Sequence, residues 1–196
     1  MSTTFTPTWN KNIMKFNHYP ILPNSFRMLI IGSSGSGKTV LLLKMILTPN
    51  FINYDNLIIF SKTIDQTEMQ IIFSGLNSGL AKQDIVGLFQ NQDKIPYDTS
   101  IRDLCEELYE ETKCGELNSK TSSAEMVYRR HPQKIDVSMS NKYHEIIPCE
   151  KLDQTKKNLI IFDDCVNMKN QEIMESYFIR GRHNNFNVIY FSTKLL

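Results

Sequence analysis

The stretch Gly32-Ser33-Ser34-Gly35-Ser36-Gly37-Lys38-Thr39 decides the fold, because it fits the phosphate-binding pattern G-x-x-x-x-G-K-[ST] at every position. The apolar residues 27–31 before it predict a buried strand. Residues 40–47 after it predict a helix, which Pro49 ends. A strand, a glycine-rich loop and a helix form the context that this motif requires. These flanks disfavour the alternative, a flexible Gly/Ser-rich turn.

The residue types of this loop indicate how a nucleotide would bind. The glycines allow backbone angles that a Cβ would forbid, so consecutive N–H groups can surround an anion at a helix N-terminus. Lys38 is expected to reach the β- and γ-phosphates, and the Thr39 hydroxyl to ligate Mg²⁺. The loop therefore predicts ATP and Mg²⁺ as ligands of residues 32–39.

Length and composition are those of an ordinary globular protein. With 196 residues, 41% of them hydrophobic, the chain can form one α/β domain with a sizeable core. The net charge of +1 provides no global electrostatic argument for nucleic acid. No C-x-x-C pair occurs among the four cysteines, so we expect free thiols. The chain shows no signal-peptide pattern and no long apolar run, so we expect a soluble protein that does not bind membranes.

The chain divides into an arm and a domain. We expect residues 1–26 to be an extended arm and 27–196 to be the nucleotide-binding domain. Within the domain, about 63–155 forms a less regular insertion. Its expected features are helices at 68–73, 81–90 and 101–111, an exposed loop at 114–124, and a basic cluster at 128–131 that suits nucleic acid or an ordinary basic surface.

A second nucleotide element lies at 158–164 (NLIIFDD), where four apolar residues precede two carboxylates, as in a Walker B strand. Asp163 is expected to hold Mg²⁺ through its water shell. Asp164 occupies the place where many ATPases carry a glutamate that deprotonates the attacking water. Taken alone, the stretch also fits any strand that enters a turn. The P-loop upstream favours the Walker B interpretation.

Spacing indicates the subclass of the fold. Lys38 and Asp163 are 125 positions apart, and the strand-like run 57–60 lies between them. This organisation is typical of inserted-strand (ASCE) P-loop NTPases, three-layer α/β/α folds with a mostly parallel sheet. Residues 186–193 (FNVIYFST) predict a further strand. If it is parallel, Thr193 arrives beside the P-loop, where it can sense the γ-phosphate or place the lytic water.

The helix predicted at 168–180 joins these two strands as a right-handed crossover. Its C-terminal end would lie at the sheet edge opposite the nucleotide. Arg180, Arg182 and His183 therefore have two interpretations. They either complement the helix dipole or act in trans, as an arginine finger offered to a neighbouring subunit of a ring.

On three stretches the sequence resembles viral genome-packaging ATPases of the FtsK/HerA superfamily, including those of large DNA viruses, virophages and Polinton-like elements. These stretches are GSSGSGKT at 32–39, LIIFDD at 159–164 and GRHNNFNVIYFST at 181–193. The last is similar to that family's Arg-His element and sensor strand, although members often carry glutamine where this chain has Thr193. Such domains usually continue through one more strand, so we expect 28–31 to lie unpaired along one sheet edge and the chain to be truncated at its C-terminus.

The resemblance implies an ATP-hydrolysing motor that assembles as a homo-oligomeric ring and moves double-stranded DNA into a viral capsid. Its implied partners are the DNA and capsid or portal components, and its implied location is the host-cell cytoplasm, the virus assembly site or the virion. Lys38, Thr39, Asp163 and Asp164 would carry binding and hydrolysis. Two alternatives stay open: a nucleotide-binding but weakly active assembly subunit, and a nucleotide kinase.

Overall fold

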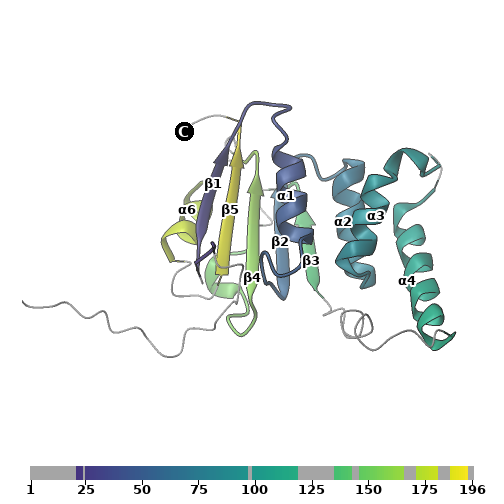
Figure 1. Cartoon of the computed structure of the whole chain (residues 1–196). Helices are drawn as coiled ribbons and strands as arrows, with labels where there is room; N and C mark the ends of the chain where they lie inside the picture. Colours follow the sequence, from purple (N-terminus) through teal and green to yellow (C-terminus); the bar gives the residue numbers. More distant parts are fainter. Residues whose placement is uncertain are drawn as a thin grey trace, which may run out of the picture.

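The computed structural model describes residues 21–23, 25–96, 99–118, 135–142, 146–165, 171–180 and 186–193, the side chains of 113–118 and 171 excepted. Within these ranges a parallel sheet has the order β1-β5-β4-β2-β3 (Figure 1). Its strands are β1 (Arg27–Ile31), β2 (Asn56–Ser61), β3 (Asp136–Ser140), β4 (Asn158–Asp163) and β5 (Phe186–Ser192). The helices are α1 (Lys38–Leu47), α2 (Thr67–Ser78), α3 (Lys82–Gln90), α4 (Ile101–Asn118) and α6 (Gln171–Arg180), with 3₁₀ turns η1 (Gln92–Lys94) and η3 (Cys149–Lys151).

Alternating side chains of the central strands build a separate core on each face of the sheet. The odd-numbered residues Leu57, Leu159 and Ile189 pack with α1 and α2. The even-numbered residues Ile58 and Ile160 pack with α6 and η3. Because neighbouring side chains of a strand point to opposite faces, a continuous apolar run can supply both cores. The predicted three-layer α/β/α fold of a P-loop NTPase is confirmed.

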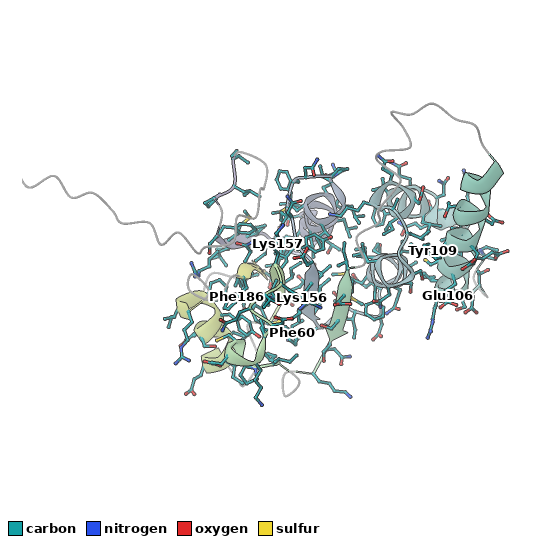
Figure 2. All side chains as sticks on the ribbon, turned by 90° about the horizontal axis from the view of Figure 1, so that it is seen from below. Phe60, Glu106, Tyr109, Lys156, Lys157 and Phe186 are labelled. Atoms are coloured by element: carbon teal, nitrogen blue, oxygen red, sulfur yellow. The ribbon has the colours of Figure 1, made fainter. Side chains whose placement is uncertain are left out.

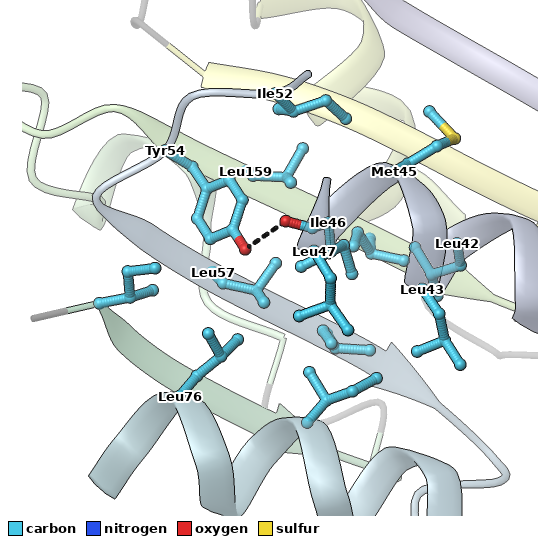
Figure 3. Packing of buried hydrophobic residues seen from close by; sticks show 14 of the residues in the cluster. Leu42, Leu43, Met45, Ile46, Leu47, Ile52, Tyr54, Leu57, Leu76 and Leu159 are labelled. Carbon is cyan, nitrogen blue, oxygen red and sulfur yellow. Dashed lines mark hydrogen bonds between the residues drawn. The ribbon is translucent and has the colours of Figure 1, made fainter. Parts of the chain in front are cut away.

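Helix α1 presents one apolar side to the sheet, as Figure 3 shows. Its residues Leu42, Ile46 and Leu47 are buried against β2 and β4. The loop after α1 returns through Ile52 and Tyr54, which are buried as well. This packing fixes the direction of the helix below the P-loop, so that the loop and the first turn of α1 stand at the carboxyl ends of the strands (Figure 1).

The strand inserted between the two Walker strands is β5, which pairs with β1 on one side and with β4 on the other. Strand β2 precedes β4 in the chain but lies on its far side. Strand β1 is at the sheet edge, as expected for 28–31, and pairs with β5 alone among the described strands. Its residues Leu29 and Ile31 are the register partners of Tyr190 and Ser192, so they lie on the face of the sheet that carries α6, where both are exposed.

Helices α2, α3 and α4 extend the molecule beyond β2 and β3 (Figure 1). Seen from the amino ends of the strands, Glu106 and Tyr109 of α4 lie far from Lys156, Lys157 and Phe186 (Figure 2). The helices predicted at 68–73 and 81–90 are present, the first extended to Ser78 and ended by Gly79. The division at residues 26 and 27 stays a prediction, since 1–20 lie outside the described residues.

Inside the segment 63–155, one prediction was wrong and one strand was not predicted. Helix α4 continues to Asn118, so 114–118 are helical and not part of a loop, because the helix formers of 106–113 carry the helix past Gly115. Strand β3 was not predicted, since only two apolar residues, Val137 and Met139, alternate in its polar sequence. Both pack against the core on the α1 side. The basic cluster 128–131 lies outside the described residues.

Candidate functional site

The P-loop has the backbone conformation that an anion cradle needs. Gly35 has φ 76° and Gly37, at the N-terminus of α1, has φ 82°. These left-handed angles are unfavourable for residues with a Cβ. Residues 33–37 are exposed, and Lys38 and Thr39 are half-buried in the first turn of α1. The loop therefore offers backbone N–H groups to solvent at a helix N-terminus.

The ammonium group of Lys38 lies against the loop itself. Its Nζ donates hydrogen bonds to the carbonyl oxygens of Gly32 at 2.7 Å and Ser33 at 2.8 Å. The Gly32 N–H donates to the Ser192 carbonyl at 3.1 Å, which joins the start of the loop to the end of β5. Lys38 is thus held at the mouth of the cradle by contacts that a phosphate group can replace.

Asp163 ends β4 as a buried carboxylate with hydroxyl partners at the end of β2 and in the turn after it. Its Oδ2 accepts a hydrogen bond from Ser61 Oγ at 2.8 Å and lies 3.5 Å from Thr63 Oγ1. Burial raises the pKa of Asp163, and the charge of Asp164 acts in the same direction. The two hydroxyls and the nearby Lys38 charge lower the pKa and so favour the carboxylate. A cation placed here would add to that effect.

Asp164 is held in an unusual backbone conformation at the sheet edge. Its φ is 51°, a left-handed angle that is uncommon for residues other than glycine. Its N–H donates to the Phe191 carbonyl at 3.0 Å, and its Oδ1 accepts a hydrogen bond from Thr193 Oγ1 at 3.2 Å. Such conformations persist where the surroundings enforce them, often at functional sites. Strand β5 thus fixes Asp164 through both backbone and side chain.

The strand order brings these groups to one edge of the sheet. Ile31 pairs with Ser192, and Asp163 pairs with Phe191, so the P-loop and the carboxylates flank the end of β5. Strand β5 lies between β1 and β4, so at the usual strand spacing these two strands are roughly 10 Å apart. Thr193 lies between them, as predicted from a parallel β5. The predicted groups of the loop, β4 and β5 therefore converge.

The residues present fit a nucleotide with its cation. The exposed cradle and Lys38 suit phosphate, while the Thr39 hydroxyl and the Asp163 carboxylate are oxygen donors of the kind that Mg²⁺ prefers. The described residues hold no cluster of three or more His, Cys, Asp or Glu side chains that could bind a metal by themselves. A cation at this edge would therefore take its remaining ligands from the phosphates and water.

Of the predicted basic residues, Arg180 is placed and Arg182 and His183 lie outside the described residues. Arg180 ends α6 and forms an ion pair with Glu150 of η3, with both side chains more than half exposed. Helix α6 leads to the start of β5, at the sheet edge opposite the P-loop. Arg180 therefore does not join the other predicted site residues within this chain.

Sequence reasoning missed the hydroxyls of Ser61 and Thr63. The sequence predicts a strand at 57–60, and Ser61 is the next residue, with no role assigned to it. It shares one signal with Asp163, a polar residue directly after an apolar strand. What the sequence did not contain is the register of β2 and β4, in which Ser61 is the partner of Asp163.

The predicted free thiols are confirmed for Cys105, Cys149 and Cys165, which are buried and form no disulfide. Burial raises the pKa of Cys165 to about 12, so this thiol beside the two aspartates stays protonated at neutral pH. Among the described helices, none is both long and apolar enough to cross a membrane.

Among known protein families, one family model matches a part of this chain. Residues 13–73 match the family model of the poxvirus A32 protein, a viral genome-packaging ATPase family of the FtsK/HerA type. The match includes β1, the P-loop, α1 and β2, and it ends before β4. Neither curated proteins nor solved structures contain a significant match.

Proposed function

We propose that this protein is an ATPase that drives double-stranded DNA into a viral capsid. The observation that carries the proposal is the convergence of the P-loop, Asp163, Asp164 and Thr193 at one edge of a sheet with the order β1-β5-β4. The match to the poxvirus A32 family over 13–73 supports the viral packaging role. The resemblance at 181–193 supports the same assignment.

In this proposal each residue has a defined task. The backbone of 32–37 surrounds the phosphates, and Lys38 exchanges its bonds to the loop carbonyls for the β- and γ-phosphates. Thr39 and Asp163 hold Mg²⁺, which neutralises charge that develops on the phosphates. Asp164 orients the attacking water and accepts its proton. Thr193, bonded to Asp164, keeps that carboxylate in place.

The proposed partners are further copies of this chain, double-stranded DNA, and capsid or portal components. Arg180, Arg182 and His183 are offered to the site of a neighbouring subunit, so the active form is a homo-oligomeric ring. The ring would enclose DNA and dock on capsid or portal components, at the assembly site in the host-cell cytoplasm or in the virion. Because DNA binding without sequence preference releases counterions from phosphates, stimulation by DNA is expected to fall as salt rises.

The proposed function predicts ATP hydrolysis that depends on Lys38. Phosphate release is measured with and without linear double-stranded DNA, at several protein and salt concentrations. Lys38→Ala should lower turnover by about 100-fold or more, because it removes a charge aimed at the transferred phosphoryl group. The matched control, Lys44→Ala, changes an exposed lysine of the same helix and should leave turnover unchanged.

Two outcomes would contradict this function. Tight ATP binding without turnover, even with DNA at high protein concentration, would indicate the assembly-subunit alternative, which the aspartate at 164 in place of glutamate favours. Transfer of the γ-phosphoryl group to a small molecule, detected by mass spectrometry of the products, would indicate a kinase.

A further inference from the structure

Two hydroxyl groups, those of Ser61 at the end of β2 and Thr63 in the turn after it, form a hydrogen-bonded series that leads to Asp163 Oδ2. Ser61 is fully buried, and its Oγ donates to Asp163 Oδ2 at 2.8 Å. The same Oγ accepts the Thr63 N–H at 3.1 Å and lies 3.0 Å from Thr63 Oγ1. Thr63 Oγ1 is also within 3.5 Å of Asp163 Oδ2. Ser61 therefore binds this carboxylate oxygen directly, and Thr63 lies behind Ser61 at a longer distance from the same oxygen.

The direction of this series follows from counting protons. A serine hydroxyl has one hydrogen to donate and two lone pairs to accept with. Because Ser61 gives its hydrogen to Asp163, Thr63 must be the donor in the contact between the two hydroxyls. Ser61 then uses all of its hydrogen-bonding capacity, with both Thr63 groups as donors. Such a satisfied series holds its members in one geometry.

The position of the pair in the fold is set by two elements. Ser61 is the last residue of β2 and is in register with Asp163 of β4. Thr63 lies in the turn that leads to α2 and is half-buried. Neither residue belongs to the P-loop, to β4 or to the sensor strand β5. The pair reaches the site from the side of the sheet opposite to β1.

We propose that Ser61 and Thr63 are positioning residues that orient Asp163 toward the divalent cation. Thr63 holds Ser61, and the Ser61 hydrogen bond holds Oδ2 and restrains rotation of the carboxylate that would help to hold the cation. The inference rests on the proposed function, since it assigns two further residues to the same site. Outer partners of metal ligands commonly change metal affinity by about 10–100-fold when they are removed.

The test compares variants that lose or keep the hydroxyl. Ser61→Ala removes the direct donor, and Thr63→Val removes the second hydroxyl while keeping the shape of the side chain. Thr63→Ser is the matched control because it retains the hydroxyl. The measurements are the Mg²⁺ concentration for half-maximal ATP hydrolysis, kcat at saturating Mg²⁺, and binding of Mn²⁺-ATP followed by electron paramagnetic resonance.

We expect Ser61→Ala to raise the half-saturating Mg²⁺ concentration about 10-fold and Thr63→Val to raise it less, with most of kcat restored by excess Mg²⁺. Thr63→Ser should resemble the wild type. A merely structural role would lower thermal stability and kcat and leave Mg²⁺ and Mn²⁺ affinities unchanged, which overturns the inference. If the wild type itself fails to bind Mn²⁺-ATP, the proposed function fails first and this inference with it.

Discussion

At the scale of single residues, the glycines of the P-loop meet two different demands. Gly35 and Gly37 have positive φ and open space around the position of a Cβ. Gly32 has no such angle, but a Cβ there would lie 2.5 Å from Ser36 Oγ and 3.3 Å from Ser36 Cβ. The motif requires glycine at 32 and 37, whereas Gly35 occupies one of its variable positions. Only the coordinates show that the first one makes room for a side chain of the loop.

We predict that Gly32→Ala weakens ATP binding because it pushes Ser36 out of the loop. Ser36→Ala alone should have little effect, and Gly32→Ala combined with Ser36→Ala should recover most of the affinity, since the closest clash is then removed. The measurement is the Kd of a fluorescent ATP analogue for each variant. Equal ATP affinity of Gly32→Ala and of the double variant would show that crowding at Ser36 is not the cause.

At the scale of elements, the C-terminal end of α1 is held by two side chains. The Ile46 carbonyl accepts a hydrogen bond from Tyr54 Oη at 3.1 Å and another from Lys82 Nζ at 2.8 Å (Figure 3 shows the first). The Lys82 ammonium also lies 4.5 Å from the centre of the Tyr54 ring. A cation at a helix C-terminus is favourable, and these contacts join α1 to the start of α3.

Stability should depend on pH through Lys82. Burial lowers its pKa from 10.5 to about 8, so between these values the unfolded chain binds more protons than the native one. Lys82 should therefore contribute a rise of about 1–2 kcal/mol in the free energy of unfolding between pH 7 and pH 9.5, which is seen as a growing difference between the wild type and Lys82→Met. Burial raises the pKa of the Cys105 and Cys165 thiols, so their ionisation on unfolding lowers the free energy of unfolding of both proteins over the same range. Urea unfolding of the wild type and of Lys82→Met at each pH measures the effect.

In Lys82→Met this rise should disappear, whereas Lys94→Met, which changes an exposed lysine, should retain it. The series stops at pH 9.5 because tyrosines of the unfolded chain ionise near pH 10. Burial raises the pKa of Tyr54, so its ionisation on unfolding would oppose the trend at higher pH. Parallel curves for the wild type and Lys82→Met would contradict the assignment to Lys82.

Elements differed in how well the sequence predicted them. Strands β2, β4 and β5 were predicted because continuous apolar runs mark strands that are buried on both faces. Strand β1 was predicted from its apolar run before the P-loop, although Leu29 and Ile31 on one of its faces are exposed. Strand β3 was missed because an edge strand needs only Val137 and Met139 for its one apolar face. The length of α4 was underestimated because 114–124 were taken as a loop, although Gly115 costs the helix only about 1 kcal/mol and the helix continues to Asn118.

At the scale of the whole molecule, Arg180 faces away from the nucleotide site of its own chain. Its ion pair with Glu150 joins α6 to η3 at the opposite edge of the sheet. Both side chains are largely exposed, so the pair contributes little to stability. Breaking this ion pair therefore costs Arg180 little free energy. The arginine can exchange Glu150 for a phosphate of the nucleotide bound to a neighbouring subunit, as the proposed ring requires.

We predict that activity returns when two inactive variants are mixed. Lys38→Ala subunits retain Arg180 but cannot hydrolyse ATP, and Arg180→Ala subunits retain the P-loop but lack the arginine. If Arg180 acts in trans, the mixture should hydrolyse more ATP than the sum of its parts, measured as phosphate release with DNA. Glu150→Gln, which frees the arginine without removing it, should stay active.

The absence of any gain on mixing would assign Arg180 to the helix C-terminus alone, or the role in trans to Arg182 or His183. Separate mixtures with Arg182→Ala and with His183→Ala distinguish these cases. Size-exclusion chromatography of each mixture checks that the subunits assemble, so a failure of assembly is not mistaken for a failure of catalysis.

The sequence by itself determined the parts whose geometry is local. Eight consecutive residues specify the P-loop, since glycine angles and a helix N-terminus need no distant partner. Tertiary structure alone decided which strand lies beside which: β5 between β1 and β4, Ser61 opposite Asp163, and Arg180 beside Glu150. Strand order and register depend on packing and hydrogen bonds between segments that are distant in the chain, and no local pattern encodes them.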